Sequence, residues 1–318
     1  MYICLGINEN DDDMRCLTIL LICTINLLNA QSNLALVNVN AELETVKSDD
    51  NFFEFEKSFE LVGGMVFIQA DVNGQRGSYI LDTGAPGIIL NEKPTVISTA
   101  YDASSLNGPV EIGEVLIDNF EWGIINRKGV TGFQVDISHL ENSFDKEIAG
   151  LIGFDVFADY ELLFDYHKQT VKVYPSKKND LHKNNKVFEK VSFKRDGHLP
   201  IIPIKIDGKT YHFGLDTGAE INILSHKVLQ KVDANAISFL ISNEVRGLDQ
   251  KVTKSQSIRL NKCLINDYSV DNQVFMILDL SHVNANAEKE IDGILGFPFF
   301  EQHRISINYG NNKLYFWD

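Results

Sequence analysis

The pattern of apolar and polar positions occurs twice along the chain. Residues 64–93 read GMVFIQADVNGQRGSYILDTGAPGIILNEK, and residues 198–227 read HLPIIPIKIDGKTYHFGLDTGAEINILSHK, so the two align without a gap at an offset of 134. A second pair, EIAGLIGFDVF from Glu147 and EIDGILGFPFF from Glu290, aligns at an offset of 143. The pattern therefore predicts one structural unit written twice, with the extra residues of the second copy between its two motifs.

Each copy carries local signals of β structure. Alternating apolar positions flank Asn73-Gly74 and Asp207-Gly208, dipeptides typical of a type I′ hairpin because both central residues need a positive φ. The second strand of each hairpin, 78–81 or 212–215, leads straight into Asp-Thr-Gly-Ala. Each copy then offers one or two helical turns (154–160, 297–303) followed by two strands (161–164 and 170–174, 304–308 and 313–316). No helical period persists, so we predict a mainly β fold of two similar lobes.

The N-terminal region has a different pattern. From Met14 the chain reads MRCLTILLICTINLLNAQ, with a basic start, an apolar run and a small residue at Ala30, which is typical of a secretory signal. The apolar run is shorter than the roughly 20 residues of a membrane span. The acidic residues before Met14 favour that methionine as the true start, and a buried or anchoring N-terminal helix is the alternative.

We therefore divide the chain into five parts. Residues 1–30 are the expected signal region, residues 31–55 a lead-in, residues 56–175 the N-terminal lobe, residues 176–187 a polar linker and residues 188–318 the C-terminal lobe.

Composition and charge narrow the function classes. Of 318 residues, 44% are hydrophobic and 23% charged, which is ordinary globular composition and excludes a disordered or collagen-like chain. Lys and Arg number 29 against 44 Asp and Glu, with no concentrated basic stretch, so we expect no nucleic-acid partner. Three of the four cysteines lie within the first 23 residues, so this is not a disulfide-built fold.

The repeated Asp-Thr-Gly motif carries the candidate chemistry. Each aspartate, Asp82 or Asp216, ends an apolar strand, and the following glycine lets its N–H approach the carboxylate closely. Two similar lobes about a pseudo-twofold axis would place the two carboxyl groups opposite each other. Two carboxyl groups so close together cannot both ionise freely, so the pair shares one proton, and one group acts as base and the other as acid. Such a pair can activate a water and polarise an amide carbonyl without a metal.

In these repeated motifs the sequence resembles an aspartyl protease of the retropepsin-like group. Its two lobes are fused in one chain, as they are in pepsin-like enzymes and in a bacterial tandem-lobe type. The resemblance rests on LDTGA at 81–85 and 215–219, GLIGF at 150–154 and GILGF at 293–297. It implies an acid-protease-like β-barrel in each lobe, with Asp82 and Asp216 holding the attacking water. It also implies supporting roles in the active-site loops for Thr83, Gly84, Ala85, Thr217, Gly218 and Ala219, and packing of Gly153 and Gly296 beneath the site.

Two features depart from the pepsin-like pattern. Ala85 and Ala219 stand where pepsin-like enzymes have a hydroxyl residue, as in retroviral relatives. Losing that hydrogen-bond donor should raise the pKa of the pair and extend activity towards neutral pH. The flaps that cover bound substrate have only candidates, 107–113 and 244–253, without the aromatic signature of pepsin flaps.

The sequence thus predicts an exported aspartic endopeptidase, periplasmic or secreted and bacterial. It should act on polypeptides as a monomer, without a cofactor, a metal or a membrane span in the mature chain. The alternative is a catalytically silent peptide-binding module on the same fold. Pairing of two chains is disfavoured because one chain already holds both Asp loops.

Overall fold

The computed structural model describes residues 17–19, 24–27, 54–96, 101–105, 108–177, 180–240, 243–246, 252–281, 283–284 and 290–318. Most of the expected signal region and lead-in lies outside these residues. Within the signal region, Leu17–Ile19 (β1) and Thr24–Leu27 (β2) are short strands. The signal itself stays a prediction. No helix among the described residues is long and apolar enough to cross a membrane.

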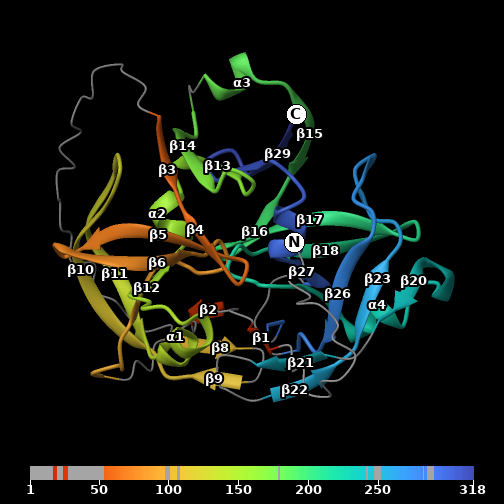
Figure 1. Ribbon diagram of the computed structural model, residues 1–318, viewed down its shortest axis with the longest axis horizontal. Coiled ribbons are helices and arrows are strands. Elements are labelled where there is room, and N and C mark those ends of the chain that lie inside the picture. The colour runs from red at the N-terminus through yellow and green to blue at the C-terminus, as the bar shows by residue number, and fades with distance from the viewer. Residues whose placement is uncertain are drawn as a thin grey trace, which may run out of the picture.

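Six strands of the first repeat form a closed barrel. They pair in the order β10-β11-β7-β12-β6-β5, and a further pairing of β10 with β5 closes the ring (Figure 1). Short β4 (Glu60–Val62) extends the sheet beyond β5. The barrel strands are β5 (Met65–Val72), β6 (Gln75–Leu81), β7 (Ile88–Asn91), β10 (Gly113–Trp122), β11 (Ile125–Val135) and β12 (Gly150–Ile152).

The second repeat builds the same strand order, β23-β26-β19-β27-β18-β17, with the same parallel and antiparallel neighbours. Here β17 pairs with β24 and β16 instead of β23, so the sheet curls without the closing ladder of the first. The predicted fold class, mainly β with two barrel-like lobes, is confirmed. The strands are β16 (Lys194–Asp196), β17 (Leu199–Ile206), β18 (Lys209–Leu215), β19 (Asn222–Ser225), β20 (Ile237–Phe239), β23 (Ser257–Leu260), β24 (Leu264–Ile265), β25 (Tyr268–Ser269), β26 (Gln273–Leu278) and β27 (Gly293–Leu295).

Both predicted hairpin turns are confirmed. Asn73 and Gly74 have φ of 50° and 77°, and Asp207 and Gly208 have φ of 49° and 73°. The flanking strands pair as Val72↔Gln75 and Ile206↔Lys209. Two-residue turns with positive φ match the right-handed twist of the strands they join, and so deliver β6 and β18 in register into the Asp loops.

A third sheet, the joint sheet, connects the two halves of the chain, and the sequence does not predict it. Its order is β15-β29-β28-β13-β14-β3, with three strands from each half, and β13 meets β28 antiparallel at its centre. Strands β3, β14, β13, β29 and β15 of this sheet lie in the upper part of Figure 1. The sequence predicts the individual strands of the two closing hairpins, but not their pairing with each other. The strands are β3 (Phe55–Ser58), β13 (Tyr160–Asp165), β14 (Thr170–Pro175), β15 (Val187–Ser192), β28 (Ile305–Asn308) and β29 (Lys313–Trp317).

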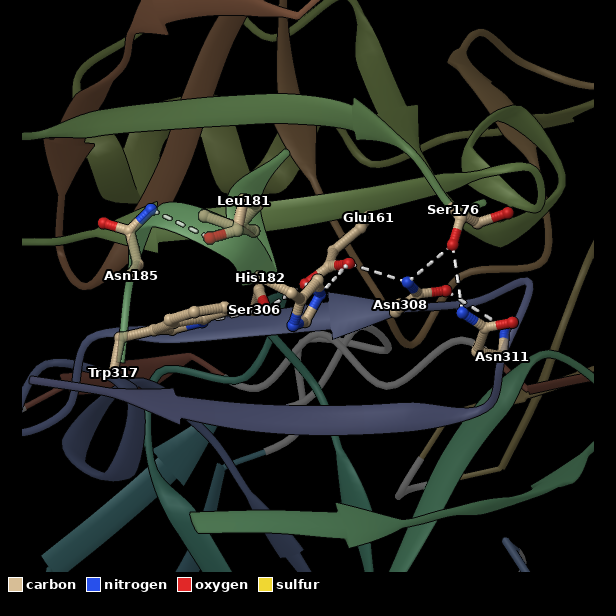
Figure 2. Close-up of polar contacts among 9 residues, drawn as sticks. All are labelled: Glu161, Ser176, Leu181, His182, Asn185, Ser306, Asn308, Asn311 and Trp317. Carbon is tan, nitrogen blue, oxygen red and sulfur yellow. Dashed lines mark hydrogen bonds and ion pairs between the residues drawn. The ribbon is translucent and has the colours of Figure 1, made fainter. Parts of the chain in front are cut away.

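A buried carboxylate fastens this joint (Figure 2). Glu161 of β13 is fully buried, and its Oε1 accepts a hydrogen bond of 2.5 Å from the hydroxyl of Ser306 on β28. Its Oε2 accepts from the amide of Asn308 at 2.7 Å and lies 2.8 Å from Nε2 of His182. His182 belongs to α3 (Leu181–Asn184), inside the predicted linker. One side chain therefore ties both central strands and the linker together.

Short elements complete the fold. The backbone forms a hairpin at each candidate flap, where β8 (Tyr101–Ser105) pairs with β9 (Gly108–Val110) and β21 (Asn243–Arg246) with β22 (Val252–Ser255). β2 pairs with β8, and β1 pairs with β21. The remaining short helices are α1 (Ser138–Phe144), α2 (Phe154–Phe157), α4 (His226–Leu229), η1 (Ala234–Ala236) and α5 (Phe297–Phe300).

Candidate active site

Each Asp loop begins where a buried strand is held by a neighbour. β6 pairs in parallel with β12, and the backbone N–H of Asp82 donates to the carbonyl of Ile152 at 2.9 Å. In the second half β18 pairs in parallel with β27, and the N–H of Asp216 donates to the carbonyl of Leu295 at 3.0 Å. The apolar-apolar-Gly strand thus fixes the residue at which each aspartate leaves the sheet.

The glycine after that strand lies against the neighbouring Asp loop. A Cβ on Gly153 would lie 2.2 Å from the carbonyl oxygen of Ala85, and one on Gly296 would lie 2.4 Å from that of Ala219. The next residue then donates its N–H to the same carbonyl, Phe154 to Ala85 at 2.9 Å and Phe297 to Ala219 at 2.8 Å. Only glycine permits this approach, so the loop and the chain after the strand are held together.

The two Asp loops are bonded to each other by their threonines. The hydroxyl of Thr83 donates to the carbonyl of Leu215 at 3.0 Å, and the hydroxyl of Thr217 donates to the carbonyl of Leu81 at 2.8 Å. Each hydroxyl oxygen also accepts the backbone N–H of the other threonine, at 2.9 and 3.0 Å. Four buried hydrogen bonds therefore cross between sequence positions more than 130 residues apart.

This arrangement brings the two carboxyl groups together. Both side chains are fully buried. Oδ1 of Asp82 accepts the N–H of Gly84 at 2.7 Å, and Oδ1 of Asp216 accepts that of Gly218 at 2.8 Å. A Cβ on Gly84 would lie 2.7 Å from Cγ of Asp216, and one on Gly218 2.4 Å from Cγ of Asp82. Each glycine therefore makes room for the carboxyl group of the other half.

Burial governs the ionisation of this pair. Removal from water raises the pKa of Asp82 above its ordinary value, although hydrogen bonds from its partner and from Gly84 oppose the rise. Burial also raises the pKa of Asp216, and the nearby charge of Asp82 raises it further. Two interacting carboxyl groups lose their protons in separate steps. Between those steps the pair holds one proton, and so offers a base and an acid at one place.

The other predicted loop residues lie within the same assembly. The methyl groups of Ala85 and Ala219 are fully buried. Their backbone N–H groups donate to the carbonyls of Asp82 and Asp216, both at 3.2 Å. A side-chain hydroxyl is missing at both positions, so neither carboxyl group gains a side-chain donor there, although the backbone N–H of Ala85 lowers the pKa of Asp82.

Sequence reasoning missed two buried tyrosines near the pair. Tyr166 follows β13 and Tyr309 follows β28, and both are buried within the range of the aspartate charges. Their offset of 143 equals that of the GLIGF and GILGF motifs, so extending the second alignment would have found them.

Among the described residues, no group of three or more His, Cys, Asp or Glu side chains is placed to hold a metal ion. The expected lack of a metal or cofactor remains a prediction.

Comparison with protein families points to the same chemistry. Residues 202–299 match the family model described as aspartyl protease. The match supports a protease-type enzyme. The matched segment runs from β17 into α5 and includes Asp216, Thr217 and Gly296, whereas the equivalent positions around Asp82 lie outside it. No curated protein matches the chain.

Proposed function

We propose that this chain is an aspartic endopeptidase of the retropepsin-like type, with both halves of the active site in one polypeptide. The observation that carries the proposal is the reciprocal bonding of the two Asp-Thr-Gly loops. Thr83 and Thr217 each bond the other loop at two points, and each glycine abuts the opposite carboxyl group. A decayed or purely structural pair would not need both complete motifs.

In the proposed mechanism Asp82 and Asp216 share one proton. The ionised carboxylate removes a proton from a water molecule, whose oxygen attacks the peptide carbonyl carbon. The protonated carboxyl group hydrogen-bonds the carbonyl oxygen as negative charge develops there. Collapse of the tetrahedral intermediate breaks the C–N bond, and a carboxyl group delivers a proton to the leaving amine. The near symmetry of the loops allows either aspartate to start as the acid.

Substrate access is part of the proposal. Both carboxyl groups are buried in the full chain, in which the leader strands β1 and β2 pair with β21 and β8. A peptide therefore reaches the pair after the leader is removed or after part of the protein moves. We assign this movement to the hairpins β8–β9 and β21–β22, which follow the Asp loops in equivalent places along the chain. Because β2 covers one edge of β8 and β1 one edge of β21, the outer edges of β9 and β22 are the ones that offer backbone groups to an extended peptide.

Further parts of the proposal follow from the sequence pattern. We assign pseudo-twofold symmetry to the two lobes, since strand order and neighbours repeat between them. One chain supplies both Asp loops, so we propose a monomer. The leader pattern at 14–30 supports export to the periplasm or the medium.

A digest of a denatured protein mixture tests the activity. Purified protein should cut the mixture, and a statine-type inhibitor, Asp82→Asn or Asp216→Asn should abolish cutting. Asp136→Asn is the matched control, because it changes a partly exposed aspartate whose carboxylate bonds Ser138 instead. Full cutting by pure Asp82→Asn protein would refute the mechanism. Peptide binding without cutting by the wild type would favour the silent binding module.

A further inference from the structure

Two buried tyrosines occupy equivalent places in the joint sheet. Tyr166 directly follows β13 and Tyr309 directly follows β28, the two central strands that pair with each other. Their side chains are 6% and 2% exposed. Each also packs against a phenylalanine of its own half, Phe59 for Tyr166 and Phe193 for Tyr309, and these two are related by the offset of the first repeat.

Each tyrosine crosses to the Asp loop of the other half. The ring of Tyr309 packs edge-on against Phe154 with centroids 5.2 Å apart, and the N–H of Phe154 donates to the carbonyl of Ala85. The ring of Tyr166 lies 5.8 Å from that of Phe297, whose N–H donates to the carbonyl of Ala219. Each phenol therefore lies one residue away from the loop that carries the opposite aspartate.

Packing accounts for the burial of the two aromatic rings, but not for the burial of their hydroxyl groups. Neither phenol oxygen has a hydrogen-bond partner within the part of the chain that the structure describes. Burying a hydroxyl without a partner costs free energy that phenylalanine would avoid. The negative charges of Asp82 and Asp216 act on Tyr309, and that of Asp216 acts on Tyr166. No hydrogen bond joins either phenol to the pair, and Oδ2 of Asp82 and Oδ2 of Asp216 are likewise buried without a partner among the described residues. Each hydroxyl can therefore act on the pair through its dipole, without a direct hydrogen bond.

We propose that Tyr166 and Tyr309 are positioning residues whose hydroxyl dipoles stabilise the single negative charge shared by Asp82 and Asp216. The inference rests on the proposed function. Each half of the chain then supplies a tyrosine that stabilises the charge at the Asp loop of the other half, so a working pair needs the joint sheet to be assembled. Burial raises the pKa of both phenols, so they stay neutral O–H groups over the working pH range.

Other charged groups near the tyrosines differ between the halves. The guanidinium of Arg195 lies 4.6 Å from the centroid of Phe154 and also faces Tyr309 and Asp155. On the other side Glu301 faces Tyr166. The charge of Arg195 opposes the rise in the pKa of Tyr309, whereas the charge of Glu301 adds to the rise in the pKa of Tyr166.

The test removes single oxygen atoms. Tyr166→Phe and Tyr309→Phe keep the rings, and Tyr211→Phe is the matched control. The Tyr211 side chain is 5% exposed with an unbonded hydroxyl, but it faces Asp292 and Asp207 and not the pair. The pH dependence of kcat and kcat/KM on one peptide is measured for all four proteins. Both site variants should move the acidic limb upward by about 0.5 to 1 pH unit, with the control unchanged.

The outcomes separate this inference from the proposed function. If the wild type cuts, Asp82→Asn does not, and the tyrosine variants keep the wild-type pH profile, the inference alone is wrong. If the wild type does not cut, the proposed function fails and thermal unfolding decides the inference. The difference in melting temperature between Tyr166→Phe and wild type should then become more negative as the pH rises from 4 to 7, while the difference for Tyr211→Phe does not change with pH. A difference that is independent of pH for both variants would overturn the inference.

Discussion

Replacing Thr217 by valine tests the bonding between the Asp loops. Valine keeps the shape of the side chain but removes its hydroxyl. The carbonyl of Leu81 then loses a donor at 2.8 Å, and the backbone N–H of Thr83 loses an acceptor at 3.0 Å. Both groups are buried between the two loops, so water cannot replace the lost partner without opening the site.

The expected cost follows from counting the abandoned groups. A buried polar group left without its partner costs about 1–3 kcal/mol, so two such groups predict a loss of roughly 2–6 kcal/mol in the free energy of unfolding. Thr217→Ser is the matched control, because it keeps the hydroxyl and removes one methyl group, at a cost of about 1 kcal/mol.

Urea unfolding at pH 7, followed by tryptophan fluorescence, measures both variants against wild type. Trp122 and Trp317 are buried, one in the first barrel and one in the joint sheet, so fluorescence reports on both. Thr217→Val should unfold at a clearly lower urea concentration than Thr217→Ser. Equal midpoints for the two variants would refute the idea that these hydrogen bonds hold the loops together.

Three further changes give distinct expectations. Burial raises the pKa of Asp216, so the stability that its protonated carboxyl group contributes is complete below the ordinary pKa of 3.8 and is lost as the pH rises through the pKa of the folded state. Asp216→Asn should therefore have a higher melting temperature than wild type at pH 7 but not at pH 3. A lower melting temperature than wild type at pH 7 would contradict this. Gly153→Ala should prevent folding or sharply lower the melting temperature, since its Cβ would meet the carbonyl of Ala85 at 2.2 Å, whereas Gly87→Ala, with 3.4 Å to its nearest neighbour, should have little effect; similar melting temperatures would count against the close packing. Glu161→Gln places an amide nitrogen against donors now held by both carboxylate oxygens, so thermal unfolding should show a loss of about 1–3 kcal/mol, and an unchanged melting temperature would argue against the buried joint.

The hairpins and Asp loops could be predicted because their determinants are local. A two-residue turn such as Asn73-Gly74 is specified by its own need for positive φ, and the repeat marks the equivalent residues in both halves. The close approach of Gly153 to its loop followed from the family resemblance and is now seen as a distance.

The joint sheet could not be predicted in the same way. The pairing of β13 with β28 brings together residues about 145 apart, and alternation within a strand does not name its partner. Glu161 illustrates the difficulty, because a charged residue at the start of a strand is ordinarily exposed. It is buried here because Ser306 and Asn308 arrive from the other half of the chain.

The two tyrosines lay within reach of the sequence. Tyr166 and Tyr309 stand at the same offset as the second motif pair, so the repeat extended further than the motifs used to recognise it. Their relation to the opposite Asp loop depends on the crossing of the halves and needs the three-dimensional structure. The roles of the hairpins β8–β9 and β21–β22 as flaps remain predictions.

The central claim is that Asp82 and Asp216 act together as one acid–base pair. Its most direct test is kcat/KM for a single peptide, chosen from the cut sites of the digest, measured for wild type, Asp82→Asn and Asp216→Asn over pH 3 to 8. The account predicts a bell-shaped profile for wild type that extends above pH 4, and a fall of at least about 10²-fold for each variant alone. A variant that keeps wild-type kcat/KM at its optimum would contradict the claim.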